Sequence, residues 1–237
     1  MRRFVIALLS AAVMGVVSAN AADMPVKAPP PVALYNWTGF YLGGHAGLAA
    51  GKYDWSFPGT TTSINHDFSQ FAGGAQLGFN YQIAQWVLGI EGSGTFGAMN
   101  GESTCPNTAV ACRSEMGWIA AATGRVGYAW DNILFYAKGG AAWTHQDYHG
   151  IFATTPAFNE SASSDRTGWT AGGGIEWAFM KNWSASIEYD YYDFGTQREN
   201  FTRDNTGFYV ESVDINSQVH TVMVSLNYYF SSLFWQS

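Results

Sequence analysis

Charged residues are scarce in this sequence. Asp, Glu, Lys and Arg together make up 12% of its 237 residues, whereas ordinary soluble domains carry about 25%. Basic residues are the scarcer kind, with 11 against 18 acidic residues and a formal net charge of −7. Because binding to nucleic-acid phosphates needs clustered Lys and Arg, this balance argues against a nucleic-acid partner.

Long apolar runs are missing after the first few residues. No later stretch of 18 apolar residues occurs, so we expect no later segment to cross a membrane as a helix. The mean hydropathy of −0.07 is also too polar for a bundle of transmembrane helices. Aromatic residues, at 16%, and glycine, at 27 residues, are abundant instead. Together these features favour a transmembrane β-barrel.

The N-terminus has the pattern of a secretory signal peptide over residues 1–21. Arg2 and Arg3 precede a short apolar stretch, and Ala19-Asn20-Ala21 is a typical cleavage site. The protein is therefore expected to be exported to the outer membrane of a Gram-negative cell. Residues 22–36 are rich in proline, which favours an extended polyproline spacer in the periplasm. A recognition motif for a periplasmic partner is the alternative for this segment.

Residues 37–230 contain eight segments in which apolar and polar residues alternate, the pattern of barrel strands with one face toward lipid. In one of them Leu77 and Phe79 are expected to face outward, with Gln76 and Asn80 inward. The predicted fold is all-β, an eight-stranded antiparallel up-and-down transmembrane β-barrel, and a soluble β-sandwich is the alternative. The segments are 40–48, 68–82, 86–97, 115–129, 133–144, 166–179, 183–194 and 219–230.

Short and long connections alternate along the chain. The short ones, near 83–85, 130–132 and 180–182, are expected to be periplasmic turns, which places both termini in the periplasm. The long polar ones are expected to be extracellular loops, over 51–67, 98–114, 145–165 and 195–218. Tryptophans occur beside both kinds of connection, as expected for the two membrane interfaces.

Five consecutive segments each place a charged residue on the predicted inner face, four to five residues from a short turn. We expect them to form a charge belt at one depth, with one further carboxylate above it: Glu91, Arg125, Lys138, Glu176, Glu188 and Asp190. Buried charges must be paired, and side chains just fill an eight-stranded barrel. The belt is therefore interpreted as a structural ion-pair core, with a gate, a proton path or a narrow conductance as the alternative.

Cysteine and histidine residues in the predicted loops are further candidate sites. Cys105 and Cys112 are the only cysteines, and in an oxidising periplasm they are expected to form a local disulfide. His66, His145 and His149 occur in the predicted long loops and are weak candidates for binding a metal or haemin iron; solvated loop histidines are the alternative. No cofactor is expected, and because no catalytic motif occurs, neither is an enzyme.

Parts of the chain resemble small outer-membrane proteins of alphaproteobacteria, the RopB-type surface antigens and their haemin-binding relatives. The resemblance rests on residues 24–31, 35–44, 124–129, 136–142 and 226–230. It implies an OmpA-like eight-stranded barrel with a mostly structural and surface-antigen role, and some members bind haemin. Residues 231–237 depart from the pattern, because the family usually ends at the aromatic equivalent to Phe230, which the barrel-assembly machinery is thought to recognise.

The sequence therefore predicts a structural outer-membrane barrel and surface antigen that supports envelope integrity. A haemin- or metal-binding surface receptor and a low-conductance channel are the alternatives. The expected partners are outer-membrane lipid and lipopolysaccharide, the barrel-assembly machinery during insertion, and host or surface ligands at the long loops.

Overall fold

The computed structural model describes residues 35–59, 61, 63–105, 110–152 and 154–230. Nearly all of these residues are in long antiparallel strands, as their alternating pattern predicts. Within this described part, no helix is long and apolar enough to cross a bilayer. The elements are β1 (Gly39–Ser56), β2 (Ser63–Ile83), β3 (Trp86–Gly97), β4 (Gly101–Thr104), β5 (Val110–Trp130), β6 (Ile133–Phe152), the 3-10 helix η1 (Pro156–Phe158), β7 (Glu160–Met180), β8 (Trp183–Arg203) and β9 (Tyr209–Tyr229).

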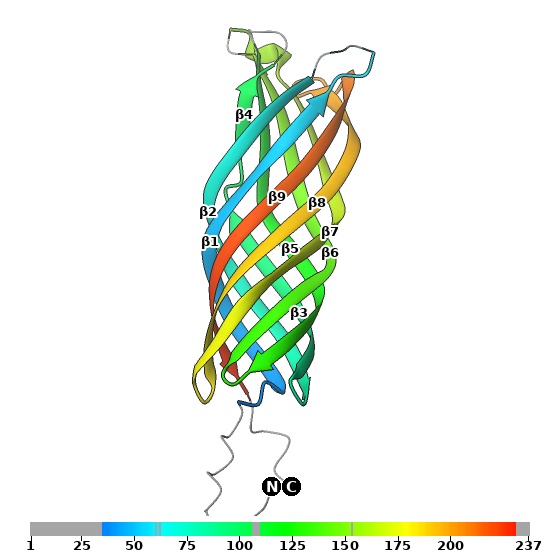
Figure 1. The fold of residues 1–237 in the computed structure, drawn as a ribbon. Coiled ribbons are helices and arrows are strands. Elements are labelled where there is room, and N and C mark those ends of the chain that lie inside the picture. The colour runs from blue at the N-terminus through cyan, green and yellow to red at the C-terminus, as the bar shows by residue number, and fades with distance from the viewer. Residues whose placement is uncertain (1–34, 60, 62, 106–109, 153, 231–237) are drawn as a thin grey trace, which may run out of the picture. The chain divides into compact units, whose positions relative to one another are not determined.

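The strands form a closed ring (Figure 1). Each strand pairs with the next one along the chain, except that β3 and β4 do not pair, and β1 pairs with β9 to close the ring. The pairing of β3 with β5 completes the wall, and the short β4 pairs with β5 beyond the end of β3. β3 and β4 pair with successive parts of β5, so they occupy one strand position in the ring. The nine strands therefore form an eight-stranded barrel, which confirms the predicted fold. Over the length of β3 the ring is closed, which satisfies the need for paired backbone groups in lipid.

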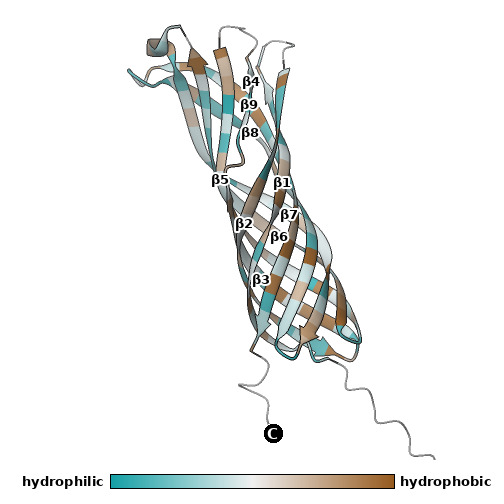
Figure 2. Ribbon diagram, turned by 90° about the vertical axis from the view of Figure 1, so that its left-hand side faces the viewer, coloured by the Kyte–Doolittle hydropathy of each residue, from teal (hydrophilic) through white to brown (hydrophobic). Residues whose placement is uncertain are grey.

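Side chains alternate between lipid and interior along every strand, so that brown and teal positions mix along the ribbons in Figure 2. Phe71, Leu77 and Ile90, for example, are 64–69% exposed on the outer surface. Gln76 and Asn80, which alternate with them, are buried. The predicted inward and outward assignments of these residues are correct. Successive side chains of a strand point to opposite faces, so the apolar residues that face lipid also determine which residues face inward.

Three tight turns join strands at one end of the barrel, here called the turn end (Figure 1). Ala84 and Asp131 in two of these turns have φ values of 53° and 57°, in the left-handed region that two-residue hairpin turns require. β1 begins and β9 ends at this end, as predicted from the alternation of short turns and long connections. The opposite end, where the longer connections lie, is called the loop end.

The long connections are much shorter than predicted. The segments predicted as loops over 51–67, 98–114, 145–165 and 195–218 are mostly strand, and the connections between strands are 57–62, 105–109, 153–159 and 204–208. β1 and β2, for example, stay paired as far as Ser56 and Ser63. The strands continue beyond the apolar band as polar strands, because backbone pairing does not require lipid. Polarity alone was therefore a poor guide to where the strands end.

Two apolar layers fill the interior, one near each end. The layer near the turn end includes Trp37, Val87, Leu134 and Tyr229, and the Trp37 indole is completely buried inside the mouth. The layer toward the loop end includes Tyr53, Trp55, Met99, Met116, Tyr148 and Phe201. The predicted signal peptide (1–21), all but the end of the predicted spacer (22–36) and the C-terminal extension (231–237) lie outside the described residues.

Candidate functional site

The six residues of the charge belt lie together between the two apolar layers. The order along the chain shows this: Val87 on β3 belongs to the turn-side layer, Glu91 on β3 to the belt, and Met99, just after β3, to the loop-side layer. The even spacing of Val87 and Glu91 keeps both side chains on the inner face of the strand. β5, β6, β7 and β8 contribute Arg125, Lys138, Glu176, Glu188 and Asp190. All of the belt is buried apart from Glu188, whose side chain is 13% exposed.

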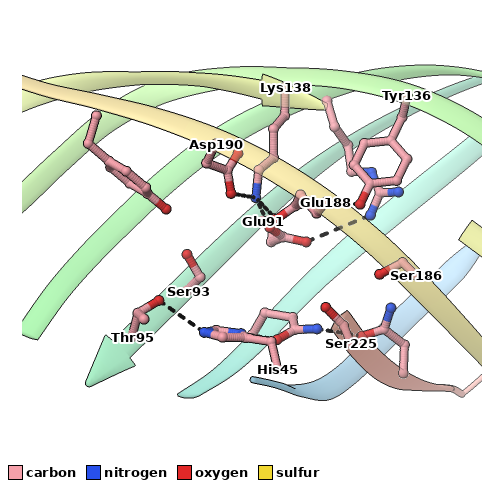
Figure 3. Close-up of a pocket in the computed structure, with 14 residues that line it drawn as sticks. His45, Glu91, Ser93, Thr95, Tyr136, Lys138, Ser186, Glu188, Asp190 and Ser225 are labelled. Carbon is pink, nitrogen blue, oxygen red and sulfur yellow. Dashed lines mark hydrogen bonds and ion pairs between the residues drawn. The ribbon is translucent and has the colours of Figure 1, made fainter. Parts of the chain in front are cut away.

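Lys138 is the centre of one half of the belt (Figure 3). Its Nζ lies 3.0 Å from Glu91 Oε1, 2.6 Å from Glu188 Oε1 and 3.3 Å from Asp190 Oδ2. One ammonium group therefore faces three carboxylates from two strands, one on β3 and two on β8. The Tyr136 hydroxyl donates a further hydrogen bond of 2.6 Å to Glu188 Oε2.

Arg125 organises the other half. Its Nη2 lies 2.9 Å from Glu176 Oε2 and its Nη1 lies 3.7 Å from Glu91 Oε2, so that Glu91 joins the two cations. The guanidinium also stacks on the Tyr136 ring, 3.9 Å from its centroid, and donates a 3.0 Å hydrogen bond to the Tyr41 hydroxyl. Tyr41 in turn donates to Glu91 at 2.7 Å.

Neutral donors complete the belt, which has four carboxylates for two cations. Glu176 Oε1 accepts hydrogen bonds of 3.0 Å from both Asn227 Nδ2 and the Tyr229 hydroxyl, and another from Ser184. The alternation in the predicted segment 219–230 puts Asn227 and Tyr229 on the inner face, but it does not indicate that they contact Glu176. The depth of each inward residue depends on strand register, which alternation alone does not determine.

The space left around the belt is very small. The cavity between Lys138, His45 and Gln76 has a volume of about 20 Å³, which is enough for one water molecule. His45 closes it on one side through its contacts with Gln76 Oε1 at 2.6 Å and Thr95 Oγ1 at 2.9 Å. A cavity this small favours the interpretation of the belt as a hydrogen-bonded core over its interpretation as a path for solutes.

His66 was predicted to lie in a long loop, but the structure places it on β2, with its side chain inside the barrel. Its side chain is 3% exposed, and its ring nitrogens lie 3.1 Å from Ser103 Oγ and 2.8 Å from Ser114 Oγ. Burial among aromatic rings lowers the pKa of His66 to about 4. The prediction was wrong because β2 extends well beyond the apolar band.

His145 and His149 are both on the outer face of β6, again in strand rather than in a loop. They are four residues apart, which in a strand separates them by about 13 Å, so they cannot share a metal ion. His145 Nδ1 lies 2.8 Å from Asp165 Oδ1, and this hydrogen bond raises the pKa of His145. The described residues contain no group of three His, Cys, Asp or Glu side chains that could hold a metal.

Cys105 and Cys112 form the predicted disulfide, with their Cα atoms 5.2 Å apart. The bond connects the end of β4 to β5 at the loop end. Aromatic residues of the predicted loops differ in their burial. Tyr53, Trp55 and Phe201 are buried in the loop-side layer, whereas the exposed ones are Phe158, Phe208 and Tyr209.

A closed ring of eight antiparallel strands, apolar outside and filled with polar and apolar layers inside, is a transmembrane β-barrel of the outer-membrane type. The family model of the outer membrane protein beta-barrel domain matches residues 9–230. The chain therefore belongs to that family, and it is an outer-membrane protein of a Gram-negative bacterium.

Two relatives from Brucella confirm the resemblance to alphaproteobacterial outer-membrane proteins. The chain is 31% identical to the 31 kDa outer-membrane immunogenic protein of Brucella melitensis, over 94% of this chain and 98% of the relative. It is 29% identical to the 25 kDa outer-membrane immunogenic protein of Brucella ovis, over 73% and 78%. Among solved structures, the outer membrane protein OprG of Pseudomonas aeruginosa is similar in fold, with a TM-score of 0.51 at 9% identity over 83% of this chain and 99% of that one.

Proposed function

We propose that this barrel is a non-catalytic, structural component of the outer membrane that displays its loop end as a surface antigen. The observation that carries the proposal is the filled interior: two apolar layers lie on either side of a charge belt, and the cavity beside the belt admits one water. In a barrel filled in this way, the wall that spans the membrane carries the structural role and the exposed end carries the surface-antigen role. The names of the Brucella relatives, as immunogenic proteins, support the antigen role.

The outer surface supports lipid and lipopolysaccharide as partners. Trp86, Trp130 and Trp177 are exposed beside the turns, and Trp143 and Trp169 are exposed nearer the loop end. Amphipathic rings at these two levels are typical of residues at membrane interfaces. We propose the barrel-assembly machinery as a partner during insertion, which every barrel of this type requires.

The exposed aromatic residues at the loop end support a surface ligand as a further partner. Phe208 is 74% exposed and Tyr209 is 63% exposed. Exposed aromatic side chains are enriched in protein interfaces. The proposal places them outside the cell, where a host or other surface molecule can reach them.

Epitope insertion tests the display of the loop end. One variant carries a short epitope between Asn205 and Thr206, in the exposed connection between β8 and β9. The matched control carries it between Asp131 and Asn132, in a tight turn at the opposite end. Antibody is expected to label intact cells only for the first variant, and both after permeabilisation. Labelling of intact cells through the Asp131 insertion alone would contradict the proposed orientation.

Deletion of the gene tests the envelope role. Cells without the protein are expected to become more sensitive to detergent, and the wild-type gene is expected to restore resistance. Unchanged sensitivity after deletion would contradict a role in envelope integrity while leaving surface display intact.

A further inference from the structure

A cavity at the loop end is separate from the charge belt. Its volume is about 620 Å³, and it lies on the outer side of the loop-side apolar layer. Apolar groups from four parts of the chain line it, namely Trp55, Val110, Phe152 and the Cys105–Cys112 disulfide. Pockets of this size and character are typical of sites for small organic molecules.

Glu160, the first residue of β7, lines this cavity with a buried side chain, since the residue is 8% exposed. Room for its carboxyl comes from Gly150 on β6: a Cβ there would lie 2.8 Å from Glu160 Cγ and 2.9 Å from Oε1. Arg203 is opposite Glu160 in the pairing of β7 with β8, but among the described residues its guanidinium contacts Phe158 and forms no ion pair with the Glu160 carboxyl. The carboxyl faces the cavity from a largely buried position, where it is less well solvated than on the surface, and a bound cation would offset that cost.

The surrounding charges favour a cation over an anion. Glu211 on β9 lines the same cavity as Glu160. Arg203 on β8 is the basic residue of the lining, but its Nη1 donates a 2.7 Å hydrogen bond to the carbonyl oxygen of Phe158 and its guanidinium stacks on the Phe158 ring. Two carboxylates therefore face the cavity against one guanidinium that already has partners.

The ionisation of Glu160 fits this arrangement. Its burial raises the pKa of Glu160 to about 7, with a smaller contribution in the same direction from Glu211. The charge of Arg203 lowers the pKa of Glu160, and the charge of Asp204 raises it. A bound cation favours the ionised carboxyl, so binding and ionisation of Glu160 are coupled.

We propose that the loop-end cavity binds a small organic cation, an ammonium or guanidinium group carried on an apolar or aromatic body. The cationic group pairs with Glu160 and Glu211, and the apolar body packs against Trp55 and Phe152. Aromatic rings also attract cations held over their faces. The chemistry of the lining defines this class of ligand, and it is independent of the structural role proposed above.

Binding of a matched pair of probes tests the inference. Tryptamine has an indole ring and a primary ammonium, and indole-3-propionate has the same ring with a carboxylate. Isothermal titration of the full barrel in lipid nanodiscs at pH 8, with empty nanodiscs as a blank, is expected to show saturable binding of tryptamine and none of indole-3-propionate. Equal binding of both probes, or no saturable binding of tryptamine, would overturn the proposal.

Substitution of the carboxyl tests its role. Glu160→Gln keeps the size and removes the charge, and tryptamine binding is expected to weaken about tenfold or more. The control is Glu115→Gln, because Glu115 is partly exposed and pairs with Arg113 at 2.8 Å instead of lining the cavity. If Glu160→Gln does not fold, Glu211→Gln carries the same expectation. Unchanged affinity in a folded variant at either position would contradict the proposal.

The pH dependence provides an independent readout. Between pH 8 and pH 6 the ionised fraction of a group with a pKa of about 7 falls about tenfold. Tryptamine affinity of the wild type is expected to fall with it, while the ammonium of the probe stays charged. Glu160→Gln is expected to have a nearly flat profile over this range. The same slope in both proteins would show that Glu160 does not bind the cation.

Discussion

Replacing Lys138 by Met is expected to destabilise the barrel by about 3–5 kcal/mol, the cost of removing one partner from a buried ion pair. Three contacts of 2.6–3.3 Å from Nζ to Glu91, Glu188 and Asp190 would be lost. Three carboxylates would then remain within the barrel without their ammonium. Tyr41 and Tyr136 would still donate hydrogen bonds to Glu91 and Glu188, which is why the cost is not larger.

Urea unfolding of the barrel refolded in lipid vesicles, followed by tryptophan fluorescence, measures this loss. The matched control is Lys52→Met, because Lys52 forms a 3.2 Å pair with Asp54 in which the two side chains are 47% and 35% exposed. The control is expected to cost no more than about 1 kcal/mol. The double variant Lys138→Met/Glu188→Gln should recover part of the loss. A cost for Lys138→Met as small as that for Lys52→Met would refute the interpretation of the belt as a core.

Reduction of the Cys105–Cys112 disulfide should lower the free energy of unfolding by about 2–3 kcal/mol, measured by urea unfolding with and without reductant; a double Cys→Ser variant should not respond to reductant. Acidification from pH 6.5 to 4 should lower the free energy of unfolding by up to about 3 kcal/mol, because His66 has a pKa of about 4 when folded and is protonated more readily in the unfolded chain. The free energy of unfolding of a His66→Gln variant should depend less on pH over this range. Gly140→Ala should cost about 1–3 kcal/mol, since its Cβ would lie 2.0 Å from the Ala122 carbonyl oxygen. Gly124→Ala, with open space at its Cβ, should be nearly neutral in the same unfolding assay.

The wall of the barrel could be predicted from sequence because lipid imposes a strict rule on it. Alternate residues must be apolar, so Leu77 and Phe79 could be assigned outward and Lys138 inward with no structural information. The same rule placed the charged residues of five strands on the inner face. Their common depth followed from the distance of each residue to a short turn.

The parts that depend on register could not be predicted. Tyr229 meets Glu176 across 53 residues of sequence, and no periodicity indicates that contact. Glu160 and Glu211 fall in the predicted polar loops 145–165 and 195–218, because strands beyond the membrane have no lipid-facing apolar side to indicate them. His66 was misplaced for the same reason, and so the loop-end cavity had no signal in the sequence.

Conductance of the purified, refolded barrel in a planar lipid bilayer tests the central claim, that the interior is closed, most directly. Two apolar layers and a belt with room for one water predict a silent membrane, provided that the protein is shown to be inserted and folded. Neutralising Arg125 or Lys138 in that assay tests whether the belt lines a path. Reproducible unitary steps from the wild type, altered by either substitution, would contradict the account and make the barrel a channel.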